Sequence, residues 1–184
     1  MQTLKMSVIS LGILLAGFLA VAGDAPTISA VPKKLEPTTY QIRNQKYQEL
    51  LRPQDANSAT GTRLVLYAPE PWKCMTWRLQ PAGESAFFVK NLFTAKTFAA
   101  DANTNPLQLA VVQVPIKKDG TENPTWQFME LADGSYKISD AKSGQALTAT
   151  KGESDQIKVT AEAWSNLPEQ KWQLQPLDPK KLTM

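Results

Sequence analysis

The sequence has no histidine and only one cysteine, Cys74, among its 184 residues. The absence of histidine excludes a Ser-His-Asp or Cys-His nucleophile system and a His-ligated zinc site. A single cysteine excludes a disulfide within the chain, a CxxC redox pair and a thiolate metal cluster. An enzyme would have to work without the side chain best suited to proton transfer near neutral pH. We therefore expect no catalytic activity, no metal site and no cofactor.

An excess of charge of one sign is also missing, since 20 Lys and Arg face 17 Asp and Glu. The lysine pairs at 33–34, 117–118 and 180–181 are isolated from one another. Binding to nucleic acid needs a concentrated basic face, so we expect no nucleic-acid partner. The lysine pairs are interpreted as solvated surface.

Only the beginning of the chain has a long hydrophobic run. Lys5 precedes an apolar stretch over residues 8–22, and Ala20-Val21-Ala22 matches the small-x-small pattern of a cleavage site. The stretch is shorter than the roughly 20 residues that cross a bilayer, which favours a signal peptide over a membrane anchor. We expect residues 1–22 to be cleaved and the protein to be secreted or periplasmic, with no membrane span left.

Proline marks the segment that follows. Pro26, Pro32 and Pro37 lie among small and charged residues, a composition typical of an extended linker over residues 23–37. Residues 179–184 are interpreted as a similar tail. The intervening segment, 38–178, is long enough for one well-formed core.

An internal repeat organises this segment. Three stretches recur about every 48 residues, each with an aromatic residue, a β-branched residue two positions later and a final Asn or Asp: Tyr40-Gln41-Ile42-Arg43-Asn44, Phe87-Phe88-Val89-Lys90-Asn91 and Tyr136-Lys137-Ile138-Ser139-Asp140. The alternation predicts a short half-buried strand that ends in a turn. Two further marks follow at similar offsets, an apolar residue and a tryptophan: Leu51, Phe98 and Leu147, then Trp77, Trp126 and Trp172.

The repeat predicts an all-β fold of three units, at about 38–82, 86–131 and 135–178. Each unit holds about four short alternating stretches, and no helical period is sustained after residue 22. A unit of this size cannot bury its own apolar face, so we expect the three to pack around one axis. Trp77, Trp126 and Trp172 are expected in the shared core, where each indole N–H needs a hydrogen-bond acceptor.

The three units resemble the ricin B-type β-trefoil family, in which each repeat ends in Gln-x-Trp. The third unit matches best, through Tyr136-x-Ile138, Lys142-Ser143-Gly144-Gln145-Ala146-Leu147 and Gln170-Lys171-Trp172. The other two units keep Trp but replace Gln. The resemblance implies a β-trefoil that binds carbohydrate.

The resemblance also implies three elements in each sugar site. These are an Asp after the second strand, an aromatic residue near the third strand and an Asn before Gln-x-Trp, which together bind hydroxyl groups and the apolar face of a sugar. The Asp position holds Arg52, Ala99 and Thr148, and the Asn position holds Cys74, Asn123 and Glu169. The aromatic position falls near Tyr67, Ala110 and Thr160. No unit contains all three elements.

Two tryptophans lie outside the repeat register and suggest altered sites. Trp72 accompanies Tyr67 and Arg52 in the first unit, and Trp164 accompanies Asn166, Thr148 and Gln170 in the third. The alternative is that both indoles fold back over the barrel as hydrophobic plugs, and that Gln170 only satisfies backbone groups. In the second unit, Asn123 is the ligand candidate.

Two functions remain open. The first is a secreted, non-catalytic module that binds a glycan or glycoprotein. The second is a protein-interaction or receptor-binding subunit of a secreted assembly, with no working sugar site and with another protein chain as partner. Cys74 is expected to be buried and inert, with a disulfide to a partner chain as the alternative. The ligand's identity, the oligomeric state and the source organism stay open.

Overall fold

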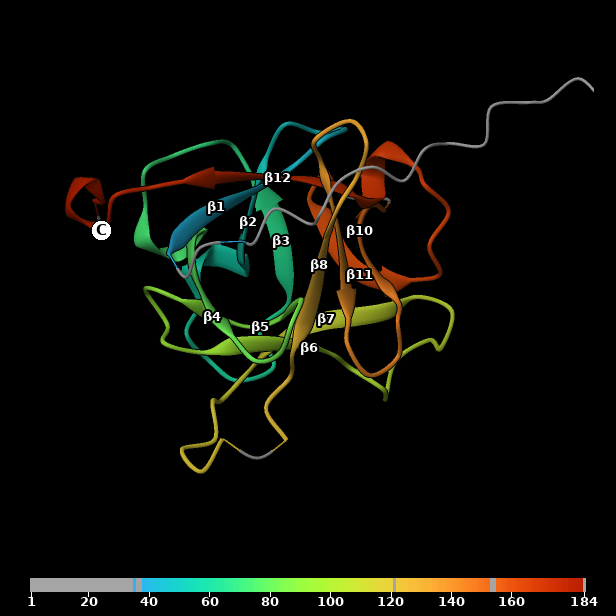
Figure 1. Cartoon of the computed structure of the whole chain (residues 1–184), viewed down its shortest axis with the longest axis horizontal. Coiled ribbons are helices and arrows are strands. Elements are labelled where there is room, and N and C mark those ends of the chain that lie inside the picture. Colours follow the sequence, from blue (N-terminus) through green and yellow to red (C-terminus); the bar gives the residue numbers. More distant parts are fainter. Residues whose placement is uncertain (1–34, 36–37, 121, 153–154, 184) are drawn as a thin grey trace, which may run out of the picture.

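Twelve β-strands and four short 3-10 helices form the described part of the chain (Figure 1). The computed structural model describes residue 35 and residues 38–120, 122–152 and 155–183. The predicted signal peptide and all of the predicted linker except Leu35 lie outside these residues. Within them, none of the helices has the length and apolar character that a membrane span requires.

Six strands close into a barrel, two from each unit: β1 (Thr39–Asn44), β4 (Thr76–Pro81), β5 (Ala86–Asn91), β8 (Trp126–Glu130), β9 (Tyr136–Asp140) and β12 (Lys171–Pro176). Each is antiparallel to the next in this order, and β12 pairs with β1 to complete the ring. Closure leaves the barrel without a free sheet edge.

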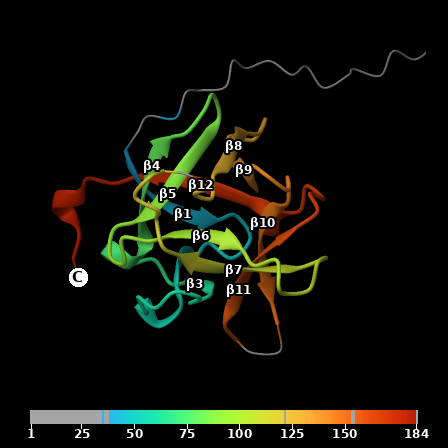
Figure 2. The ribbon, with the colours of Figure 1, turned by 90° about the horizontal axis from the view of Figure 1, so that it is seen from below.

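The other six strands form one hairpin per unit: β2 (Leu50–Pro53) with β3 (Leu64–Tyr67), β6 (Thr97–Ala100) with β7 (Leu109–Val114), and β10 (Ala146–Lys151) with β11 (Ile157–Glu162). Strand β11 also pairs with β3 and β7, so the three hairpins meet beneath the barrel (Figure 2). The prediction of a β-trefoil with three four-stranded units is confirmed.

The core contains the same tryptophan contact in each of the three units. Trp77, Trp126 and Trp172 have no exposed surface. Their indole N–H groups donate to the backbone carbonyls of the residues that form the second mark of the repeat, Leu51 (3.0 Å), Phe98 (3.1 Å) and Leu147 (2.9 Å). Each tryptophan thus buries a large apolar ring with its polar atom satisfied, and ties the last strand of its unit to the hairpin.

The strands that open the three units end in the same turn. The side-chain oxygen of Asn44, Asn91 or Asp140 accepts hydrogen bonds from the backbone N–H groups two and three residues later. This is the turn chemistry expected of Asn and Asp at such positions. The fourth residue after each, Gln48, Ala95 or Gly144, has a positive φ.

The 3-10 helices lie in the connections between strands: η1 (Gln54–Ala56), η2 (Lys73–Met75), η3 (Pro168–Gln170) and η4 (Pro179–Lys181). Helices η2 and η3 occupy the same position, directly before the last strand of the first and third units. Beyond η4, the backbone of Thr183 forms a parallel bridge with Trp72. The end of the chain therefore packs beside the loop that carries Trp72.

Candidate functional site

The hairpins bring the predicted ligand positions next to each other within a unit. Arg52, Ala99 and Thr148 directly follow the carbonyls that accept from the three tryptophans. Strand register identifies the aromatic position in each unit. The residues just before those carbonyls are Leu50, Thr97 and Ala146, and they pair with Tyr67, Val114 and Glu162, respectively. The assignment of Ala110 and Thr160 to this position is wrong. Both are buried, and the hairpin loops differ in length, so counting along the sequence misses the partner.

In the first unit, the structure brings three predicted residues together. The Arg52 guanidinium lies over the Tyr67 ring, with its carbon 3.8 Å from the ring centroid. The Tyr67 and Trp72 rings are 5.9 Å apart between centroids and tilted by 31°. Tyr67 is 38% exposed, and Trp72 is partly buried. Two neighbouring aromatic rings between β3 and η2 thus lie beside one buried cation.

Side-chain packing and backbone hydrogen bonds hold Trp72 in place. Its ring packs against the small apolar cluster of Leu50, Cys74 and Met75. Its backbone carbonyl accepts hydrogen bonds from the Thr76 hydroxyl and the Met75 backbone N–H. The backbone of Thr183 bonds the neighbours of Trp72, donating to the Pro71 carbonyl and accepting from the Lys73 N–H. The indole therefore has one packed side, as the plug interpretation expects, and one side toward Tyr67, as a ligand platform requires.

Cys74 lies beneath this surface and is 5% exposed. Burial raises the pKa of its thiol, while the nearby Arg52 charge acts in the opposite direction. The thiol is therefore neutral at physiological pH, which lowers its reactivity. This agrees with the expectation of a buried residue.

In the third unit, the predicted residues satisfy one another. Gln170 is 1% exposed, and its amide donates to the Thr148 hydroxyl (3.2 Å) and to the Ala163 carbonyl (2.8 Å). The amide oxygen of Gln170 accepts from the backbone and hydroxyl of Ser165. All the polar capacity of Gln170 is used inside the protein, which favours the backbone-satisfying role.

The remaining third-unit candidates do not gather around Gln170. Trp164 is partly buried and lies 5.3 Å from the Lys137 ammonium. Asn166 is exposed in the following loop with a positive φ. Glu162, at the aromatic position, accepts from Thr150, Thr160 and Gln108. This position is therefore occupied by an internal polar network.

In the second unit, Asn123 closes a loop. Its side-chain oxygen accepts from the Lys117 backbone N–H, and its amide donates to the Lys117 carbonyl. The loop between β7 and β8 extends away from the barrel in yellow at the bottom of Figure 1. With Ala99 and Val114 at the other two positions, the three predicted ligand positions of this unit hold neither a charged group nor an aromatic ring.

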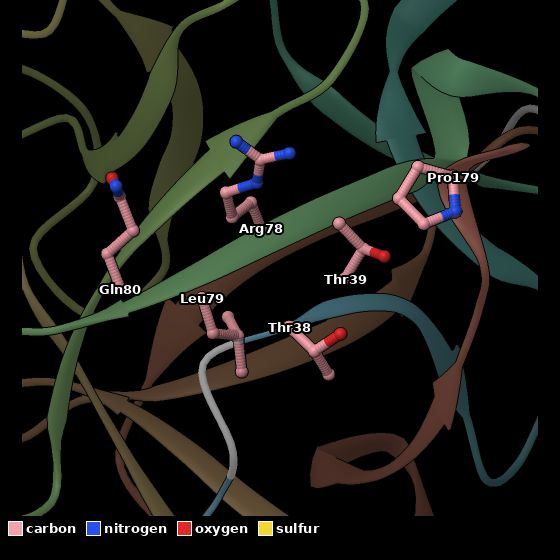
Figure 3. Close-up of a pocket in the computed structure, with 6 residues that line it drawn as sticks. All are labelled: Thr38, Thr39, Arg78, Leu79, Gln80 and Pro179. Carbon is pink, nitrogen blue, oxygen red and sulfur yellow. The ribbon is translucent and has the colours of Figure 1, made fainter.

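Two open hollows lie elsewhere on the surface. The first, of about 340 Å³, lies where β1 meets β4, and Figure 3 shows Thr39 and Arg78 side by side in it. The second, of about 410 Å³, borders Tyr67 and is lined by the carboxylates of Glu49 and Asp155 and by Gln156. Glu49 and Asp155 come from different units and belong to no motif, so the sequence alone does not indicate them. Among the described residues, no three acidic or sulfur side chains are grouped as metal ligands.

Comparison with known proteins agrees with this architecture. A family model described as Ricin-type beta-trefoil lectin domain-like matches residues 122–184, and the predicted resemblance to that family is confirmed. The matched segment is roughly the last third of the chain and contains the best-preserved repeat. The comparison with curated proteins gave no match.

Similar solved structures extend the fold assignment to the whole described region. ThreeFoil, a designed threefold-symmetric protein, has a TM-score of 0.69 at 23% identity and covers 76% of this chain and 99% of its own. The agglutinin of Rhizoctonia solani has a TM-score of 0.66 at 19% identity, covering 79% and 99%. A chain of the cytolethal distending toxin of Actinobacillus actinomycetemcomitans has a TM-score of 0.61 at 17% identity, covering 77% and 93%. At these identities, the likeness shows the β-trefoil fold.

Proposed function

We propose that this ricin B-like β-trefoil is a secreted, non-catalytic module that binds a glycan through its first unit. The observation that carries the proposal is the grouping of the Tyr67 and Trp72 rings with the buried guanidinium of Arg52. A sugar ring has an apolar C–H face that packs on aromatic rings, and hydroxyl groups that accept hydrogen bonds from a guanidinium. The other two units offer no such combination, so we assign the binding to the first.

The partly exposed rings support this site over a purely structural role. Tyr67 is 38% exposed although its neighbours Leu64, Val65 and Leu66 are buried. Burying an aromatic ring on ligand binding is favourable, and tyrosine and tryptophan are frequent in binding surfaces for this reason. A ring that served only the core would be covered by the chain itself.

A glycan array with the purified protein tests the proposal. We expect binding to a defined set of glycans, and a loss of about tenfold or more in Tyr67→Ala and Trp72→Ala. Phe93→Ala is the matched control, because Phe93 is 46% exposed in a turn of the second unit and should not affect binding. The absence of binding to any glycan at millimolar concentration would contradict the proposal.

A second candidate function is a protein-interaction or receptor-binding subunit of a secreted assembly. It is supported by the missing carboxylate at the Asp position in all three units and by the similarity to a chain of cytolethal distending toxin. Co-purification from the native source distinguishes the two functions. A stable complex with another protein, unaffected by Tyr67→Ala, would favour the second, and an isolated glycan-binding monomer the first.

Secretion is part of the proposal and has its own test. It rests on the sequence pattern over residues 1–22, with the positive start at Lys5 and the small-x-small site that ends at Ala22. Amino-terminal sequencing of exported protein is expected to begin at Gly23. Retention of the full chain inside the cell would refute export.

A further inference from the structure

Arg52 is a buried cation that forms no ion pair with a carboxylate of the described residues. Its side chain is 7% exposed, and its Nε atom is fully buried with no hydrogen-bond partner. The ion pairs among the described residues are formed by other cations, namely Lys46, Lys117 and Lys171. A buried charge is unfavourable unless it is paired and hydrogen-bonded. Among the described residues, no ion pair compensates the charge of Arg52.

Two groups are described next to the Arg52 guanidinium, and neither is a strong acceptor for its N–H donors. The Tyr67 ring lies against the face of the guanidinium at 3.8 Å and attracts its charge. A guanidinium also has five N–H donors that point outward in its own plane, where a ring beneath it accepts nothing. The Cys74 thiol is the other polar group next to Arg52, and sulfur is a weak acceptor. Neither the ring nor the thiol is a strong, negatively charged acceptor in the guanidinium plane.

We propose that Arg52 binds the carboxylate or sulfate of an acidic saccharide whose ring packs on Tyr67 and Trp72. The proposal rests on the proposed glycan-binding function and names the class of glycan. Planar and tetrahedral oxyanions both accept paired hydrogen bonds from arginine, and such charge-assisted bonds are stronger than those of neutral hydroxyls. The acid group would supply the counter-charge that no ion pair among the described residues supplies.

The charges near Tyr67 also orient such a ligand. Glu49 and Asp155 line the hollow that borders Tyr67, and Arg52 is not among the residues of that hollow. The two carboxylates can accept hydrogen bonds that sugar hydroxyl groups donate, and they repel a second negative charge. A saccharide with one acid group is therefore directed to place it at Arg52.

Matched pairs of sugars test the proposal by isothermal titration calorimetry. The probes are sialyllactose against lactose for a carboxylate, and sulfated galactose against galactose for a sulfate. The acidic member of at least one pair is expected to bind about tenfold more tightly, and this preference should weaken as salt is added. Which pair shows the preference identifies the source of the charge.

Variants of Arg52 separate ligand binding from a structural role. Arg52→Gln should abolish the preference for the acidic member, so that the acidic and neutral members of a pair bind with affinities within about twofold of each other. Arg52→Lys keeps the charge but loses the planar pair of donors, so it should retain only part of the preference. Far-UV circular dichroism checks folding, and Arg52→Lys together with the salt series decides the question if Arg52→Gln does not fold.

Three outcomes would overturn the inference. Equal affinity of the wild-type protein for both members of each pair, with binding still lost in Tyr67→Ala, refutes the acidic ligand and leaves the proposed function intact. Binding to none of the four sugars, together with an empty glycan array, refutes both. An Arg52→Gln variant that is folded and keeps the full preference for the acidic member shows that Arg52 does not bind the acid group.

Discussion

The core and the hairpin surface of this protein belong to the same threefold repeat, but only the core keeps it. Trp77, Trp126 and Trp172 are fully buried, and each donates to the corresponding backbone carbonyl of its own unit. One residue beyond those carbonyls, the three units carry a guanidinium, a methyl group and a hydroxyl: Arg52, Ala99 and Thr148.

The difference has a physical cause. Side chains in the core meet in one interior, where each must match the volume left by the other two units. Side chains on the hairpin surface do not share one interior, although some contact a neighbouring unit, as Gln108 does at Glu162. A threefold backbone therefore constrains its three core tryptophans together, whereas its three surfaces can differ more from one another. Predictions about the core should hold in all three units, and those about the surface should differ between units.

The largest effect is expected from removing one of the core indoles. Trp126→Ala leaves a large cavity beside Phe98, whose ring centroid is 4.8 Å away, and an unsatisfied carbonyl. We expect a loss of about 3–5 kcal/mol in the free energy of unfolding, measured by urea denaturation and far-UV circular dichroism. Trp77→Ala and Trp172→Ala should give similar values.

Trp164→Ala is the control for these variants. Trp164 is only partly buried, so its removal should cost less than about 1 kcal/mol. If the three core variants differed from one another as much as they differ from this control, the core would not be equivalent across units.

The next largest loss of stability is expected at the Asn and Asp turns, where it should differ between units. Asn91 is fully buried; its amide donates to the Cys74 carbonyl (2.9 Å), and its oxygen accepts two backbone N–H groups. Asn91→Ala should lose about 1–3 kcal/mol in the same denaturation assay, because buried backbone groups are left unpaired. Asp140→Ala should lose less, since Asp140 is more exposed and has no amide to donate. Equal losses at the two positions would contradict this account.

The sequence was sufficient to predict the parts of the fold that repeat. The spacing of the aromatic starts and the tryptophans predicted the barrel strands, the turns at Asn44, Asn91 and Asp140, and the buried indoles. It failed at the aromatic position of the second and third units, where hairpin loops of different length shift Val114 and Glu162 away from the expected places. Register is fixed by strand pairing across the sheet, which no spacing along one strand reveals.

The candidate site was predictable only where one unit supplies it. The predicted group of Arg52, Tyr67 and Trp72 comes from one unit, and the three side chains are in contact. Gln170 and Thr148 are also neighbours, as predicted, but they are hydrogen-bonded to each other. The hollow with Glu49 and Asp155 joins the first and third units, and no local pattern indicates it. A site between units depends on packing, which sequence spacing does not describe.

A smaller effect compares one turn position across units. Gly144, Ala95 and Gln48 all have a positive φ, which favours glycine. Gly144→Ala should therefore destabilise the protein by about 1 kcal/mol, although a methyl group there would meet no atom within 4 Å. Ala95→Gly should stabilise it by about 0.5 kcal/mol, as the relief of backbone strain exceeds the entropy cost of glycine. Thermal unfolding of the two variants measures both changes, and shifts of the same sign would show that the turns are not equivalent.

The smallest effect concerns the turns that join the units. In both, a backbone N–H bonds the carbonyl four residues later, from Ala82 to Ala86 (2.8 Å) and from Leu131 to Ser135 (2.7 Å). Only the second turn has a charged network, in which Asp133 accepts from the hydroxyl and N–H of Ser135 and from Lys171. These bonds, that of the Ser135 hydroxyl first, lower the pKa of Asp133 from 3.8 to about 2.

This network predicts a pH dependence that the first turn lacks. Because the folded pKa of Asp133 is below the unfolded value, its contribution to stability is present above pH 4 and is lost as the pH falls toward 2. The carboxylate is 39% exposed, so solvent limits the contribution to less than about 1 kcal/mol. Asp133→Asn should reduce the loss of stability between pH 4 and 2 in urea denaturation, and Ser135→Ala should reduce it in part. Glu84→Gln in the first turn, where Ala86 offers no hydroxyl, is the matched control, and an effect as large as that of Asp133→Asn would show that general charge, not this network, causes the pH dependence.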